Sequence, residues 1–182
     1  MTVLAVLGGQ GWADTYVLDP AHSSVEFRVA HLMVSKVRGN FDKFAGWFEY
    51  DPKDLGVWKA SATIEAASVN TRVEKRDAHL RSGDFFDVEK HPTLEFRSLQ
   101  AEKGVAGRKR LTGNLTLHGV TKPVVLDVEE GGVTKDPWGG TRSGFTASGK
   151  INRSEFGITG GAAGMAVGET VEIMIEVEGV KK

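Results

Sequence analysis

The sequence predicts an all-β protein, an eight-stranded antiparallel barrel with one short helix near its mouth. Most of the 182-residue chain alternates apolar and polar side chains, the period of a strand with one buried face. Residues 70–96 interrupt this alternation with a helix signal, and 23 glycines suit a chain with many tight turns. About eight such strands can remove their exposed edges by closing into a barrel.

The first part of the barrel is predicted from residues 16–69. Residues 16–50 form a first hairpin, with Gly39 and Gly46 as bulge or bend sites. Residues 58–69 follow as a strand made mostly of small side chains. Small side chains on the inner face of a barrel leave room for a cavity.

The helix signal lies between this strand and the rest of the sheet. Thr71 and Glu74 predict a capping box, in which each side chain bonds a backbone N–H that the helix start leaves unpaired. Gly83 predicts the helix stop. Phe85 and Phe86 come next, and we expect them to turn inward, so that the segment covers one mouth of the barrel.

The remaining strands are expected over residues 92–99, 111–117, 123–129, 145–151 and 171–177, the second and third of them forming a second hairpin. Each has a clean apolar face. An interior lined by both large and small side chains favours a cavity over a packed core, because eight strands enclose just enough space for one small ligand.

Residues 157–168 form a loop with five glycines and no charge. Its lack of polar groups indicates that it covers something apolar, and it is compatible with a homodimer. No Lys-Ser or Lys-Thr pair follows it, and a strand rather than a helix comes next, so it does not fit a phosphate-binding loop.

Composition excludes several classes of function. The net charge is -1, from 23 basic and 24 acidic residues, so we expect no nucleic-acid partner. No stretch approaches the ~18 apolar residues of a membrane span, so stable membrane insertion is not expected. The absence of cysteine excludes disulfides, thiolate metal sites and thiol nucleophiles.

The N-terminal residues 1–15 are predicted to lie outside the barrel domain, which spans residues 16–182. The segment is short and apolar, and Gly11 and Ala13 place small residues where a signal peptidase reads, but a basic region is missing. It is either the remnant of a secretory signal or an apolar tail. The first interpretation predicts a periplasmic or secreted protein, the second a cytoplasmic one.

Four stretches resemble the YceI family of lipocalin-like proteins: YVLDPAHSSVEFRVAHLMVSKVRGNF, NTRVEKRDAHLRSGDFFDVEKHPTLEF, LTGNLTLHGVTKPV and FTASGKINRSEFGI. They occur in the family's order, and the resemblance covers residues 16–180. It implies an extended lipocalin-like barrel that holds the long apolar tail of a polyisoprenoid or a related lipid. Members of the family are often exported.

The inward-facing apolar side chains are the candidates for contact with such a tail. They are Phe27, Val29, Phe41, Leu80, Phe85, Phe86, Leu94, Phe96, Leu115, Leu117, Leu126, Phe145, Ile173 and Ile175. Their assignment depends on the register of each strand, because a slip of one residue turns the other face inward.

The five histidines, His22, His31, His79, His91 and His118, have three possible roles: structural bonds, contact with a ligand head group, and metal binding or catalysis. No pair has the spacing of a zinc protease. We therefore predict no metal site, no cofactor and no catalytic residue.

Arg76, Asp77 and His79 share the predicted helix. They either pin the helix by capping and ion pairs or form a polar rim that receives a head group. Two other functions compete with lipid binding. One is an enzyme of isoprenoid or quinone metabolism that uses Asp77 and His79 as acid and base. The other is a structural or stress protein with a filled barrel.

Overall fold

The computed structural model describes residues 13–182, and the strands in that range form one antiparallel sheet that closes on itself. They are β1 (Asp14–Leu18), β2 (Ser24–His31), β3 (Ser35–Phe41), β4 (Phe44–Tyr50), β5 (Lys59–Glu65), β6 (Val69–Asn70), β7 (Thr93–Lys103), β8 (Lys109–Leu117), β9 (Val120–Lys135), β10 (Thr141–Asn152) and β11 (Val167–Lys181). The α-helix in this range is α1 (Glu74–Arg81). Short 3-10 turns are η1 (Pro20–His22), η2 (Leu55–Val57), η3 (Ala66–Ser68), η4 (Arg153–Phe156) and η5 (Gly161–Ala166).

The ring of the barrel has eight strands, as predicted. β1 closes it by pairing with β4 on one side and β11 on the other, so that Tyr16 lies opposite both Phe48 and Lys181. β2, β3 and β6 continue β1, β4 and β5 beyond three interruptions, at η1, at residues 42–43 and at η3. With these continuations counted, each strand pairs with its neighbours in chain order, which is an up-and-down barrel.

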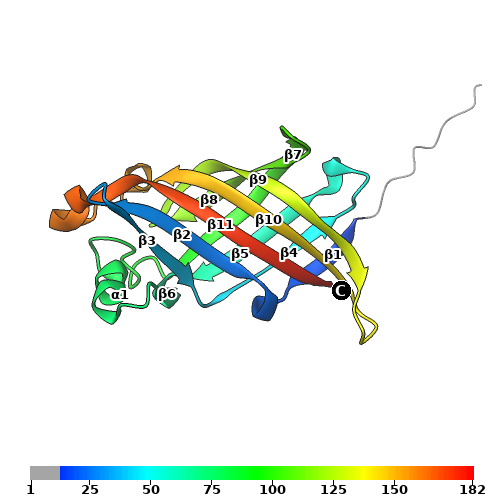
Figure 1. The fold of residues 1–182 in the computed structure, drawn as a ribbon, viewed down its shortest axis with the longest axis horizontal. Coiled ribbons are helices and arrows are strands. Elements are labelled where there is room, and N and C mark those ends of the chain that lie inside the picture. Colours follow the sequence, from blue (N-terminus) through cyan, green and yellow to red (C-terminus); the bar gives the residue numbers. More distant parts are fainter. Residues whose placement is uncertain (1–12) are drawn as a thin grey trace, which may run out of the picture.

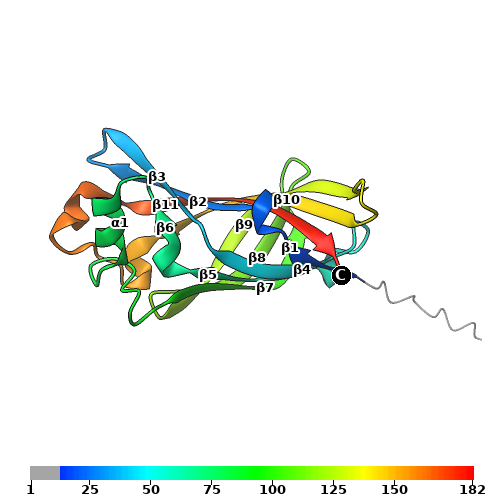
Figure 2. The same cartoon turned by 90° about the horizontal axis from the view of Figure 1, so that it is seen from below.

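The two ends of the barrel differ (Figure 1). α1, β6 and the turn between β2 and β3 lie at one end, which we call the helical end, and the C-terminus lies at the other, the terminal end. Within the described residues, β6 pairs with β3 alone, and β7 pairs with β5 and β8. Figure 2 shows α1 at the helical end, where β6 and β7 are not paired with each other.

The start of α1 differs from the predicted capping box. Val73, in extended conformation, precedes the helix and makes no side-chain cap bond. The hydroxyl of Thr71 instead donates to the carboxylate of Asp77, which also accepts the Thr71 N–H. The helix ends at Arg81 with Ser82 as its C-cap, one residue before the predicted stop at Gly83.

The predicted bulges at Gly39 and Gly46 are wrong. Both glycines continue regular ladders, opposite Phe27 and Ala62. A Cβ on Gly39 would lie 2.4 Å from Cζ of Phe27, so the glycine makes room for a ring. The first hairpin is β2–β3, and register shifts occur elsewhere, one of them between Gly144 and Phe145.

The N-terminal prediction falls mostly on residues 1–12, which lie outside the described residues, and with them Gly11 of the proposed cleavage signal. β1 begins at Asp14, inside the segment predicted to precede the barrel. A search of residues 13–182 for a helix with the length and apolar character of a membrane span finds none.

Candidate ligand-binding cavity

The barrel encloses a cavity of ≈ 260 Å³. This is close to the lower end of the roughly 300–1,000 Å³ typical of small-molecule sites. Its wall is built from the inward-facing side chains of the strands together with residues of α1 and the segment that follows it. Charged side chains in the lining are few, namely Glu26, Glu49, Lys59, Arg153 and Glu176. Apolar contact is therefore what this cavity offers a ligand.

All fourteen side chains predicted to contact a tail line the cavity. Strand residues among them are Phe27, Val29, Phe41, Leu94, Phe96, Leu115, Leu117, Leu126, Phe145, Ile173 and Ile175. Leu80 belongs to α1, and Phe85 and Phe86 follow it. Their place in the wall follows from the alternation of each strand, while their contact with a ligand stays a prediction.

Aromatic rings fill the terminal end of the barrel. The ring of Phe145 lies 5.0 Å from that of Tyr50, 5.1 Å from Phe48 and 5.5 Å from Trp58, all edge to face. The Tyr50 hydroxyl donates to Glu130 at 2.8 Å. Burial of Tyr50, together with this bond, raises the pKa of its phenol. The rings close the cavity at this end.

Sequence reasoning missed most of this aromatic group. Phe48, Tyr50 and Trp58 are buried and were not among the predicted site residues, although Phe145 was. Alternation of Phe44, Phe48 and Tyr50 in the stretch FAGWFEY carries the signal that could have found them.

At the helical end, the segment after α1 turns Phe85 and Phe86 toward the interior, as expected. Phe85 is buried, and the ring of Phe86 lies 5.6 Å from that of Phe41. Phe41 in turn lies 5.9 Å from Phe27 on β2. The covering segment is therefore packed onto the inner face of the sheet.

A second cover comes from the loop that contains η5, and Arg153 holds it in place. This arginine is 5% exposed and lines the cavity. Its guanidinium donates to four backbone carbonyls of the loop: Ile158 at 2.7 Å, Val167 at 2.9 Å, and Gly164 and Gly168 at 3.0 Å each. Nothing in the sequence pattern pointed to this role.

The outer face of the same loop is apolar and exposed. Met165 is 97% exposed, and the neighbouring β2–β3 turn exposes Leu32, Met33 and Val34. A bond of 2.8 Å from the Leu32 N–H to the Ala166 carbonyl joins the two segments. A homodimer through this loop stays a prediction.

The proposed head-group rim lies outside the cavity lining. Asp77 is buried and bonded to Thr71, and Arg76 donates to the hydroxyl of Thr71 at 2.7 Å and to its carbonyl at 2.9 Å. His79, on the exposed side of α1, lies 2.9 Å from the carboxylate of Asp84. These contacts fix α1 and its flanking segments, and head-group binding by the three residues stays a prediction.

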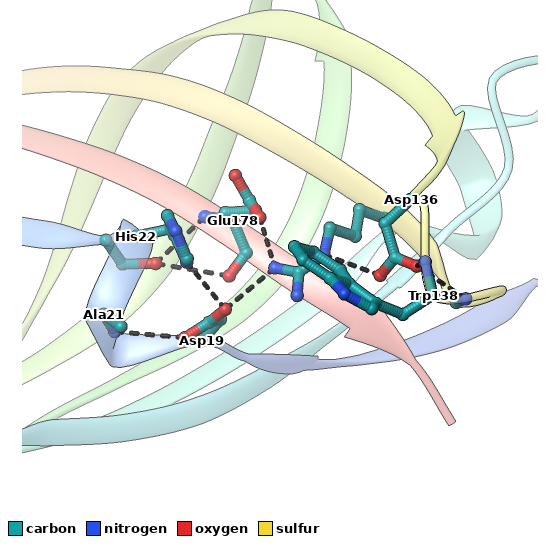
Figure 3. A network of polar contacts seen from close by, with 9 residues as sticks. Asp19, Ala21, His22, Asp136, Trp138 and Glu178 are labelled. Atoms are coloured by element: carbon teal, nitrogen blue, oxygen red, sulfur yellow. Dashed lines mark hydrogen bonds and ion pairs between the residues drawn. The ribbon is translucent and has the colours of Figure 1, made fainter.

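A polar network ties η1 to the outside of the barrel (Figure 3). The guanidinium of Arg142 lies 2.8 Å from the carboxylate of Asp19, 2.5 Å from Glu178 and 3.0 Å from Asp136. His22 adds a contact to Asp19 at 2.9 Å. Arg142, and to a lesser degree His22, lower the pKa of Asp19 to about 2. The network therefore joins the strands where β1 and β2 are interrupted.

An up-and-down barrel of eight strands around an apolar cavity defines the class of lipocalin-like proteins. Within that class, the chain belongs to the YceI-like family: the YceI-like domain matches residues 16–179. This confirms the family indicated by the four motifs.

Relatives and solved structures agree. A UPF0312 protein of Serratia proteamaculans is 44% identical over 175 residues, which span 95% of this chain and 90% of the relative. The YCEI protein of Campylobacter jejuni is 38% identical, with a TM-score of 0.75 over 84% of this chain and 89% of that one. A polyisoprenoid binding domain from Saccharophagus degradans shares the fold at 17% identity, with a TM-score of 0.68 over 94% of this chain and 100% of that domain.

Proposed function

We propose that this protein binds a long-chain apolar ligand, a polyisoprenoid, prenyl quinone or related lipid, inside the barrel, and carries or stores it. The observation behind this proposal is the ≈ 260 Å³ cavity with an almost wholly apolar wall. Aromatic rings close one end, and two covering segments close the other. The polyisoprenoid-binding domain with the same fold supports the choice of ligand class.

The energetics suit such a ligand. Burial of a tail contributes roughly 0.8 kcal/mol per methylene, less what is lost by ordering the chain. A long tail can then bind usefully without a specific polar contact. Since the rim residues Arg76 and Asp77 are engaged with Thr71, we expect loose selectivity for the head group.

The two competing functions fit the cavity less well. A filled barrel would leave no continuous void, in contrast to the cavity observed. An enzyme that uses Asp77 and His79 needs both side chains to face the ligand. Asp77 instead bonds to Thr71, His79 bonds to Asp84, and neither belongs to the lining.

Native purification followed by organic extraction and mass spectrometry tests the proposal. We expect a long-chain isoprenoid or acyl compound in about one copy per chain. A protein that emerges without lipid and takes up no added prenyl quinone would contradict lipid binding. A ligand that is chemically altered on incubation would favour the enzyme.

We also propose that the protein acts in the periplasm or outside the cell, which the apolar residues 1–15 support. Fractionation of cells that express the full chain tests this. Recovery in the cytoplasmic fraction at full length would contradict export.

A further inference from the structure

Three side chains that the cavity does not use gather at the helical end. The carboxylate of Asp87 and the imidazoles of His91 and His118 each bring a ligand atom within 4.8 Å of the other two. All three residues are half-buried, and the centroids of the two imidazole rings lie 4.7 Å apart.

Asp87 and His91 are brought together by one turn of backbone. The N–H of His91 donates to the carbonyl of Asp87 at 2.8 Å, which closes a turn of five residues. Asp87 has a φ of 45°, so the turn is not a regular helical one, but the ligand atoms of both side chains lie within 4.8 Å of that of His118. The pair therefore points jointly toward the β8–β9 turn.

His118 reaches the pair from that turn. His118 and Gly119 are its two central residues, with φ of 52° and 73°, as in a type I′ turn. Asparagine is preferred at the first of these positions, and histidine, like asparagine, adopts a positive φ more readily than most residues other than glycine. A Cβ on Gly119 would lie 2.6 Å from Cε1 of His91, so the glycine lets that imidazole lie against the turn.

A contact with the backbone orients the imidazole ring of His118. Its Nδ1 lies 3.3 Å from the carbonyl of Phe156, which can accept its proton. Nε2 is then the nitrogen with a free lone pair. Histidines that bind metals commonly donate their other ring N–H to a backbone carbonyl in this way.

We propose that Asp87, His91 and His118 bind a divalent transition-metal ion such as Zn²⁺. Two imidazoles and one carboxylate are a common donor set for zinc, and three protein ligands leave a fourth position for water. With metal–ligand bonds of ~2.1 Å, the ligand atoms of a tetrahedral site lie ~3.4 Å apart. The ligand atoms here lie within 4.8 Å of one another, so each pair must approach by ~1.4 Å or less, which side-chain rotation can supply. The ion joins the segment that carries Phe85 and Phe86 to the β8–β9 turn.

Lys90 competes with the ion. Its ammonium lies 2.8 Å from Oδ2 of Asp87, and the side chain is exposed, so it can swing into solvent. Replacing Lys90 with glutamine removes this positive charge without touching a ligand. The variant Lys90→Gln should therefore bind the ion more tightly than the wild type.

A second cluster of one histidine and two carboxylates is already occupied by a positively charged side chain. Asp19, His22 and Glu178 meet the same distance criterion, but the Arg142 guanidinium already lies 2.8 Å from Asp19 and 2.5 Å from Glu178. This cluster is already neutralised by an arginine. His22 therefore serves as a matched control for the two histidines of the proposed site.

Calorimetric titration of the full-length protein with ZnCl₂, after treatment with EDTA and dialysis, tests the site without any lipid. The wild type should bind one Zn²⁺ per chain. His118→Asn keeps a residue that the turn prefers and should weaken binding ~100-fold or more. Lys90→Gln should tighten binding several-fold, and His22→Asn should leave it unchanged.

Absence of zinc binding by the wild type, or equal binding by His118→Asn, would overturn the proposal. Folding of each variant is checked by circular dichroism. Should His118→Asn fail to fold, His91→Gln gives the same test through the visible absorption of bound Co²⁺. A spectrum retained at wild-type strength in His91→Gln would also reject the site.

Discussion

The carboxylate of Asp77 accepts hydrogen bonds from both the backbone N–H and the hydroxyl of Thr71. Both residues are buried, so α1 is attached from within to the segment that follows β6. Arg76 strengthens the attachment with its own bonds to Thr71. The helix is thereby held at the mouth without a side-chain cap at Val73.

Replacing Asp77 with alanine should lower the free energy of unfolding by about 2 kcal/mol, because a buried N–H and a buried hydroxyl lose their acceptor. Urea unfolding monitored by tryptophan fluorescence measures this. Glu74→Ala is the matched control on the same helix: its carboxylate is exposed and pairs with Arg81 at 3.3 Å, worth ~0.5 kcal/mol or less. Equal effects of the two changes would contradict the role of Asp77.

Arg153→Met should free the loop that it holds. Four carbonyls lose a charged donor, and we expect a loss of about 3 kcal/mol in stability. Hydrogen exchange read by mass spectrometry should show faster exchange across residues 157–168. Arg108→Met, at an exposed arginine in the β7–β8 connection, should leave that exchange unchanged. Wild-type protection of the loop in Arg153→Met would rule out this function of the guanidinium.

Leu117→Arg should abolish lipid co-purification. The Leu117 side chain is 4% exposed and lines the cavity, so an arginine there places an unpaired charge in an apolar wall. Val125→Arg, on the adjacent strand but 38% exposed and outside the lining, should keep the lipid. Mass spectrometry of extracts from the two purified, folded variants gives the comparison. Unchanged lipid in Leu117→Arg would remove this residue from the site.

Acid should weaken the Arg142 network. The pKa of Asp19 is lowered by Arg142 and His22 to about 2, against ~3.9 in an unfolded chain. The lowered value means that this stabilisation is fully present above pH ~4 and is lost as the pH falls through about 2. Arg142→Gln should therefore differ most from the wild type above pH 4.

Urea midpoints measured from pH 6 to pH 2 check this dependence. The difference between the wild type and Arg142→Gln should shrink as the pH approaches 2. Arg97→Gln, at an exposed arginine on β7, is the control and should track the wild type throughout. A difference for Arg142→Gln that stays constant across the range would show that the network does not titrate in this way.

Prediction from sequence succeeded for features that depend on the residues of a single strand. The inward parity of residues such as Phe27, Leu117 and Ile173 follows from alternation within a strand, and all three line the cavity. The family motifs are similarly local, since each is continuous in the chain.

It failed where the structure depends on contacts between distant segments. In place of the predicted capping box, the buried carboxylate of Asp77, one turn into the helix, accepts the Thr71 N–H that Glu74 was expected to bind, and it accepts the Thr71 hydroxyl as well. Arg153 finds its carbonyls only after the loop folds back over it. The approach of His118 to His91 needs the β8–β9 turn to meet the segment after α1, although the spacing of Asp87 and His91 was visible.

The ring of backbone hydrogen bonds closes at the terminal end through β1 and β11, whereas the helical end is closed by side chains packed and bonded onto loops. Local opening needs less free energy in segments held this way than in a closed ladder. We therefore expect a ligand of the proposed kind to exchange through the helical end while the rest of the sheet stays intact. Its residence time would then be set by the covering segments, and mutations that stabilise the sheet would leave that time unchanged.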